Sequence, residues 1–153
     1  MDKNEQQEVL KNITDATLET LGKVGYDQVI LIATRSKTKD PDEDIVLRGS
    51  SGGLAYMTIR LFERLHKGIV DNKNGQQKVL KNITDATLET LGKVGYDQVI
   101  LIAIRSKTKD PDEDVIVLKG SSDGLTYMAM RLFYQLPQGV IDTIHEIISH
   151  YLK

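Results

Sequence analysis

The sequence predicts an α+β protein made of two paired α-β-β-α units, on the strength of an internal repeat, its length and its order of elements. Residues Val9 to Ala33 recur unchanged as Val79 to Ala103, and weaker similarity continues to Gly68 and Gly139. A unit of about 70 residues is only marginally able to fold alone, so two units should share one core. We therefore expect a tandem duplication about a pseudo-two-fold axis, with antiparallel hairpins forming a shared sheet packed by helices.

The repeat also sets the expected domain boundaries. The first unit covers residues 1–71, the second covers residues 72–142, and residues 143–153 form a C-terminal extension that has no counterpart in the first unit. The offset between the copies is 70 up to Asp44 and 71 afterwards, because Val115 is an extra residue in the second copy. The linker from Asp71 to Gly75 is short and polar, so the units should be neighbours.

The first two elements of each unit are predicted to be a helix and a buried strand. Apolar residues and one threonine recur at helical spacing, and two glycines then provide a stop signal before Tyr26. The apolar run from Val29 to Ala33 is typical of a strand that is buried on both faces. The residues at helical spacing are Leu10, Ile13, Thr17, Leu21 and Val24, and the two glycines are Gly22 and Gly25.

The second half of each unit is predicted to be a strand followed by a helix. Ser36 to Asp44 is polar and contains a proline, which indicates a hairpin loop, and Ile45 to Leu47 should return as the second strand. Gly49 to Gly53 forms the turn into a helix that buries one face. The inward-facing residues of that helix are Leu54, Met57, Leu61 and Leu65.

The C-terminal extension is predicted to be an amphipathic helix. Its apolar stripe must be buried on the core of the chain or on another chain, because large exposed apolar patches are rare. We expect self-association through Ile141, Ile144, Ile148 and Tyr151, with burial on the chain's own core as the competing interpretation. The full stripe is Val140, Ile141, Ile144, Ile147, Ile148, Tyr151 and Leu152.

Composition limits the classes of partner and the compartment. A net charge of −2 argues against a general nucleic-acid binder, which usually carries a strong basic excess. No apolar run approaches membrane-spanning length, and the N-terminal residues lack a signal-peptide pattern. The absence of cysteine removes disulfides and thiolate metal sites. These features predict a cytoplasmic protein that does not bind membranes.

No complete catalytic or metal-binding motif is present, so we expect neither an enzyme nor a cofactor or metal. The glycine-rich turns match G-x-S-x-G, but His66 lies only in the first copy and has Pro137 as its counterpart in the second, so a histidine base for the serine is missing from the repeated pattern. His145 and His150 are five residues apart and diverge by about 140° on a helix, so one zinc ion cannot bind both. The aspartates of each hairpin loop lack the rest of a calcium loop and are expected to be hydrated loop tips: Asp40, Asp42, Asp44, Asp110, Asp112 and Asp114.

The strongest candidate site is an anion site at the start of the second helix of each unit. Such a helix start has free N–H groups and a favourable dipole, which attract phosphate. Tyr56 and Arg60 lie four apart on one helix face and suit a ring that carries phosphate. The candidate ligand-binding residues are Arg35, Lys37, Ser50, Ser51, Gly53, Tyr56 and Arg60, with Arg105, Lys107, Ser121, Ser122, Gly124, Tyr127 and Arg131 in the second copy.

A structural interpretation of the same residues is also open. The serine can cap the helix, the glycines can turn the chain, the tyrosine can pack at the core edge and the arginine can be solvated. Asp123 counts against phosphate in the second copy, because its carboxylate would repel an anion.

The duplicated unit, without a catalytic motif or targeting signal, resembles small proteins that bacteriophages encode against host defences. Some proteins of that kind sequester nucleotide signals at sites between subunits. The resemblance is architectural, covers both copies and assigns no residue a role. It implies a non-enzymatic cytosolic protein that captures a small phosphorylated ligand at duplicated or subunit-spanning sites. The alternative is a protein–protein interaction or inhibitor module that acts through its acidic loops and amphipathic C-terminal helix.

Overall fold

A computed structural model describes residues 3–35, 43–66, 78–105 and 114–151 of the chain. Within these residues the protein is α+β, with five helices and a four-stranded antiparallel sheet. The elements follow the order α1 (Lys3–Lys23), β1 (Gln28–Thr34), β2 (Glu43–Arg48), α2 (Ser51–His66), α3 (Lys78–Lys93), β3 (Gln98–Ile104), β4 (Val115–Lys119), α4 (Ser122–Gln135) and α5 (Gln138–Tyr151). None of these helices is long and apolar enough to cross a membrane.

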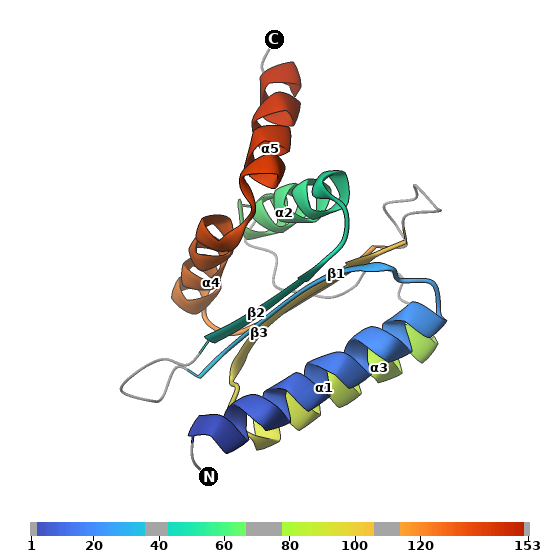
Figure 1. Cartoon of the computed structure of the whole chain (residues 1–153). Coiled ribbons are helices and arrows are strands. Elements are labelled where there is room, and N and C mark those ends of the chain that lie inside the picture. Colours follow the sequence, from blue (N-terminus) through green and yellow to red (C-terminus); the bar gives the residue numbers. More distant parts are fainter. Residues whose placement is uncertain (1–2, 36–42, 67–77, 106–113, 152–153) are drawn as a thin grey trace.

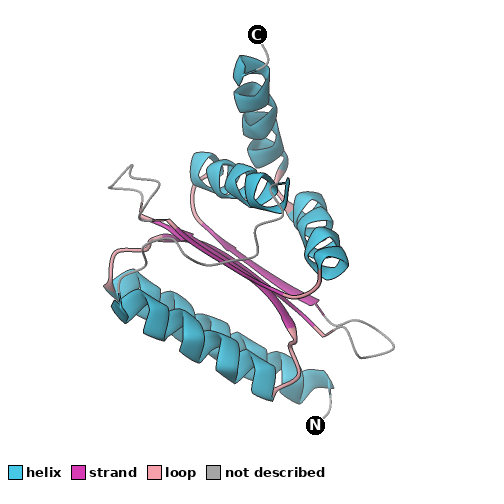
Figure 2. Cartoon of the chain, turned by 180° about the vertical axis from the view of Figure 1, so that it is seen from behind, coloured by secondary structure: helices cyan, strands magenta, loops and turns pink. Residues whose placement is uncertain are grey.

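The molecule has three layers, with the sheet in the middle (Figure 1). Helices α1 and α3 lie side by side on one face of the sheet, while α2, α4 and α5 lie on the other face (Figure 2). Neighbouring residues of a strand point to opposite faces, so each strand supplies both cores. Ile30 and Ile100 pack with α2, α4 and α5, whereas Leu31 and Leu101 pack on the side of α1 and α3.

The repeated sequence segments meet in the middle of the molecule. The strand order is β2-β1-β3-β4, so the two strands with the same apolar run are direct neighbours. Their antiparallel register places Leu31 opposite Leu101, which are equivalent positions of the repeat. On the helical layer beneath, the hydroxyl oxygens of the equivalent residues Thr17 and Thr87 are 3.2 Å apart.

The expected burial of the central strands is confirmed. Every residue of β1 is buried, and in β3 all residues after Gln98 are buried. The run from Val29 to Ala33 therefore has an apolar layer on each face, as a continuous run of β-branched residues indicates.

Helix α1 ends at the glycine-containing segment before Tyr26, where the sequence predicted it to end. Gly25 has a φ of 94°, a conformation that costs glycine little, and the N–H of Tyr26 donates to the carbonyl of Leu21 at 3.0 Å. This is a Schellman-type end, in which the left-handed residue lets the chain leave the helix. Gly95 and Tyr96 repeat it at the end of α3.

One expected boundary was wrong. Strand β2 already begins at Glu43, so the hairpin connection is shorter than the predicted loop from Ser36 to Asp44. The predicted amphipathic helix at the C-terminal end is present: it begins at Gln138, directly after Pro137, and contains Val140 and Ile141 of the predicted stripe. The linker from Asp71 to Gly75 lies outside the described residues.

Candidate functional site

The start of α2 is capped by groups of its own chain. Ser50 is the cap, and its hydroxyl oxygen accepts a hydrogen bond from the N–H of Gly53 at 3.1 Å. The carboxamide oxygen of Gln28, on β1, accepts from the N–H of Ser50 at 3.1 Å and lies 3.3 Å from the Ser50 hydroxyl. Two of the N–H groups proposed to hold phosphate therefore have internal acceptors, as the capping interpretation requires.

The start of α4 has the same serine cap, but the carboxamide oxygen of Gln98, the counterpart of Gln28, is buried and accepts no hydrogen bond. Ser121 caps this helix and accepts from the N–H of Gly124 at 3.0 Å. The Gln98 side chain lies against Gly120 and Gly124, as Gln28 lies against Gly49 and Gly53. Ser51 and Ser122, each the first residue of its helix, are exposed.

This packing gives a prediction for Gly53. A methyl group at Gly53 would overlap the carboxamide of Gln28, which would then have to leave Ser50. We expect Gly53→Ala to lower the free energy of unfolding by about 1–2 kcal/mol, the cost of lost hydrogen bonds. Gly52→Ala is the matched control, because nothing lies within 4 Å of the added atom. Urea unfolding compares them, and equal midpoints for both variants would contradict the proposed role of Gln28.

Arg35 and Arg105 are not brought to the helix starts but form reciprocal contacts between the two repeated segments. The guanidinium carbon of Arg35 lies 4.5 Å from the ring centre of Tyr96, and that of Arg105 lies 4.6 Å from the ring centre of Tyr26. Both tyrosines belong to the core on the side of α1 and α3, whereas the helix starts lie on the other face. Arg105 also donates to the carbonyl of Val24 at 2.9 Å.

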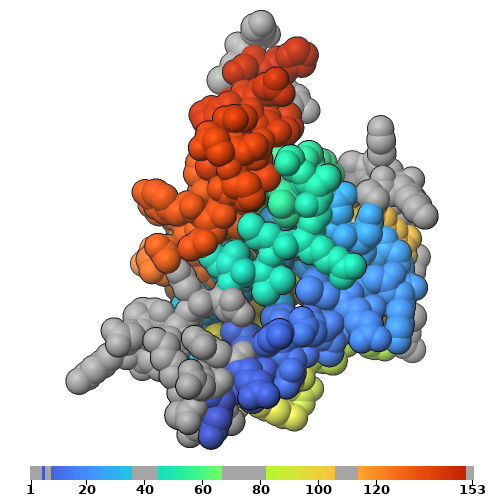
Figure 3. Space-filling view, in the orientation of Figure 1, coloured from blue at the N-terminus to red at the C-terminus, as the bar shows by residue number. Residues whose placement is uncertain are grey.

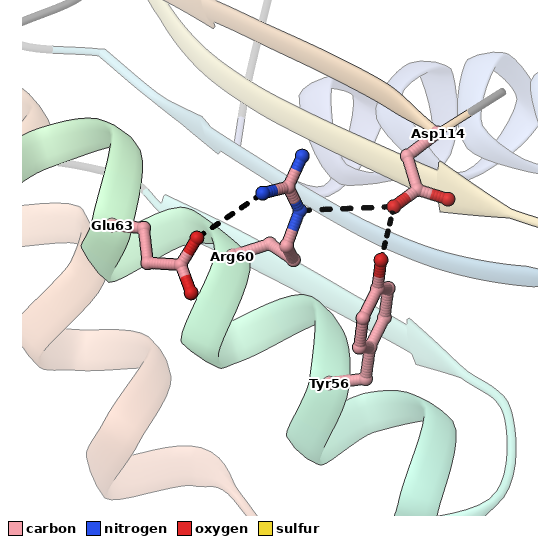
Figure 4. Close-up of polar contacts among 4 residues, drawn as sticks. All are labelled: Tyr56, Arg60, Glu63 and Asp114. Atoms are coloured by element: carbon pink, nitrogen blue, oxygen red, sulfur yellow. Dashed lines mark hydrogen bonds and ion pairs between the residues drawn. The ribbon is translucent and has the colours of Figure 1, made fainter. Parts of the chain in front are cut away.

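Tyr56 and Arg60 lie close together, as predicted, but one oxygen of the Asp114 carboxylate contacts both of them (Figure 4). The Tyr56 hydroxyl donates to Oδ2 of Asp114 at 2.6 Å, and Nε of Arg60 is 3.7 Å from the same oxygen. Arg60 also donates to Glu63 at 3.1 Å. Burial, and then the hydrogen bond to Asp114, raise the pKa of Tyr56 to about 12.

The burial of Asp114 corrects the expectation of a hydrated loop tip. Asp114 is only 7% exposed, because α2 covers it. Its position follows from the extra residue Val115, which pairs with Ala103 at the place where Asp44 pairs with Ala33. Asp114 is thereby moved one residue back along the strand, and a shift of one residue changes the face to which a side chain points.

The tyrosine of the second tyrosine–arginine pair, Tyr127, is more exposed to solvent than Tyr56 of the first pair. Tyr127 is 48% exposed, and Arg131 lies one turn further along α4. The same helix exposes two large side chains that the sequence analysis did not single out, Met130 at 54% and Tyr134 at 77%. The sequence did carry an indication of this face, because the spacing of Tyr127, Met130 and Tyr134 places all three side chains on one side of a helix.

Helix α5 combines a buried beginning with an exposed end. Val140 and Ile144 are 1% and 3% exposed, because α5 packs across α2 and joins the core there. Ile148, one turn further along the same stripe, is 45% exposed. Towards its C-terminal end, the helix projects away from the rest of the molecule (Figure 1), as the space-filling view also shows (Figure 3).

Some predicted residues lie outside the described part of the chain, namely Lys37, Lys107, Asp40, Asp42, Asp110 and Asp112. Among the described residues, no three histidine, aspartate or glutamate side chains gather as metal ligands would. No protein-family model, curated protein or solved structure matches the chain.

Proposed function

We propose that the chain is a non-enzymatic cytosolic protein-interaction module that presents the end of α5 to an apolar groove on a partner protein. The observation that carries this proposal is the stripe of α5, which passes from the buried Val140 and Ile144 to the exposed Ile148. A helix that is anchored at one end and apolar at the other is suited to helix-in-groove recognition.

The anchoring of α5 supports this role energetically. Its first turns are packed on α2, so the helix is already formed before a partner arrives. A preformed helix avoids much of the entropy cost that a disordered segment meets when it binds. The polar residues of the other face, such as His145, Glu146 and Ser149, are exposed and would form the rim of the contact.

A capture experiment tests this proposal. The full chain, immobilised and exposed to an extract of cells that express it, should retain a partner that Ile148→Asp no longer retains. Asn12→Asp is the matched control, because it adds the same charge to an exposed position of α1, on the other face of the sheet. We expect at least a tenfold loss of the partner for the first variant and no loss for the second, since a charge in a buried apolar contact is costly. A partner set that is the same for both variants would contradict the role of α5.

The second candidate function is the capture of a small phosphorylated ligand, such as a nucleotide signal, and the accessible second copy of the site favours it. Tyr127 is half exposed beside the exposed start of α4, whereas Tyr56 is engaged by Asp114. A ligand that binds only the folded state raises the melting temperature. A panel of mono-, di- and cyclic nucleotides should therefore raise it in the native chain and not in Arg131→Ala. A flat panel at millimolar concentration would leave the interaction module as the function.

We also infer that the chain is two α-β-β-α units joined as a covalent homodimer about an approximate two-fold axis. The contacts between equivalent positions support this, since Leu31 pairs with Leu101 and Thr17 meets Thr87. An isologous interface brings equivalent residues together at its axis in this way.

A further inference from the structure

Two buried side-chain oxygens near the start of α4 have no hydrogen-bond partner in the described part of the chain. They are the hydroxyl oxygen of Thr34, a residue only 4% exposed, and the carboxamide oxygen of Gln98. The two residues are paired between β1 and β3, and residues paired in this way point to the same face of a sheet. The Gln98 side chain lies against Gly120 and Gly124, so this face is the one that α4 covers. Buried polar atoms are nearly always paired, so two neighbouring exceptions indicate a place that a further group completes.

The start of α2 shows neither exception, although it is the equivalent place in the repeat. The carboxamide oxygen of Gln28, the equivalent of Gln98, accepts from the N–H of Ser50 at 3.1 Å. Ile104 stands where the other helix start has Thr34, and it packs in the apolar core. The start of α4 therefore differs from that of α2 by a hydroxyl group and by a carboxamide oxygen without a donor.

The tyrosine beside this place also differs between the two helices. The Tyr56 hydroxyl of α2 is engaged by Asp114 (Figure 4), whereas the equivalent Tyr127 of α4 is 48% exposed. Tyr127 follows Gly124 by three residues, so it lies on the side of α4 that contacts Gln98. An exposed aromatic ring thus stands next to the two oxygens.

We propose that the start of α4 binds the base of a nucleoside, with the ring against Tyr127 and its edge directed to Gln98 and Thr34. The edge of a base carries hydrogen-bond donors and acceptors, and a base stacks readily on an aromatic side chain. The oxygen of Gln98 meets a donor of the base, while the hydroxyl of Thr34 can donate to an acceptor of the base. Gln98 is partly exposed, so the ring reaches its carboxamide from the surface.

The charge of the place favours a base over a phosphate group. Asp123 lies in the first turn of α4, and its carboxylate repels an anion but not a neutral ring. This inference rests on the second candidate function, the capture of a nucleotide-like ligand, and assigns the base of that ligand to the start of α4.

The melting temperature of the full chain with nucleosides tests this site. Adenosine, guanosine, cytidine and uridine carry no phosphate, and at least one of them should raise the melting temperature at millimolar concentration. Thr34→Val keeps the shape of the side chain and removes the hydroxyl. Without a ligand this variant should melt no lower than the native chain, because the lost oxygen has no partner, but its affinity should fall about tenfold. Thr90→Val, at an exposed position of α3 on the other face, is the matched control and should bind as the native chain does. Unchanged affinity in Thr34→Val would overturn the proposal.

A second pair of variants tests the stacking. Tyr127→Ser should weaken nucleoside binding about tenfold, whereas Tyr134→Ser, at a position of α4 that is 77% exposed, should have no effect. Equal effects of the two changes would overturn the role of Tyr127. A shift with nucleotides but with none of the nucleosides would overturn the base site and leave the second candidate function standing. No shift with either class would overturn both.

Discussion

Residues 1–71, expressed alone, should form a homodimer and not a folded monomer. In the full chain β1 is fully buried, with β2 on one side and β3 on the other. Removal of the second half exposes the free edge of β1 and the apolar residues beneath it. The sequence Gln28 to Ala33 is the same as Gln98 to Ala103, so β1 of a second molecule can take the place of β3 in the same register.

Sedimentation and circular dichroism check this expectation together. The half chain should be a folded dimer at high concentration and lose its structure on dilution, because folding and association are then one equilibrium. Leu31→Asp in the half chain should remove both structure and association, since it places two carboxylates at the axis of the new sheet. A stable, folded monomer of residues 1–71 would contradict the shared core.

Replacement of Asp114 should be among the most damaging single changes in the chain. Asp114→Ala removes the acceptor of the Tyr56 hydroxyl and the carboxylate beside Arg60. We expect the free energy of unfolding to fall by about 2–3 kcal/mol, a magnitude typical of hydrogen bonds to charged groups. Asp15→Ala is the matched control, because its side chain is exposed on α1, and its effect should be within about 0.5 kcal/mol. Similar unfolding midpoints for the two variants would show that Asp114 is not a structural anchor.

The same contact predicts a dependence on alkaline pH. The pKa of Tyr56 is raised to about 12 from its ordinary value of 10.0. Between these values the unfolded chain loses the proton while the folded chain keeps it, so stability present below pH 10 is lost as the pH rises towards 12. Tyr56→Phe should remove this component, which denaturation at several alkaline pH values can measure. An identical alkaline loss in the variant would assign the effect to other tyrosines.

The elements of the fold could be predicted from sequence because each has a local cause. The apolar run from Val29 to Ala33 indicates a doubly buried strand, Gly25 ends a helix, and Ser50 begins one. The apolar stripe that begins at Val140 likewise indicates the last helix, which starts at Gln138 directly after Pro137.

The arrangement of the candidate site depended on information that local patterns do not contain. Tyr56 and Arg60 were correctly placed on one helix face, but their partner Asp114 comes from the other half of the chain. The signal was the inserted Val115, which reverses the face of the residue before it. The contacts of Arg35 with Tyr96 carried no sequence signal, because they depend on the antiparallel pairing of β1 with β3.

The crossed arginine–tyrosine contacts make the two halves energetically dependent on each other. Arg35 leaves a strand of the first half and lies over a tyrosine of the second, while Arg105 does the reverse with Tyr26. Local opening of either half therefore breaks both contacts, that of Arg35 with Tyr96 and that of Arg105 with Tyr26. Together with the shared central strands, this raises the free energy of any state in which one half is folded and the other is not. We therefore expect the chain to unfold in a single cooperative transition, although its sequence consists of two repeated segments.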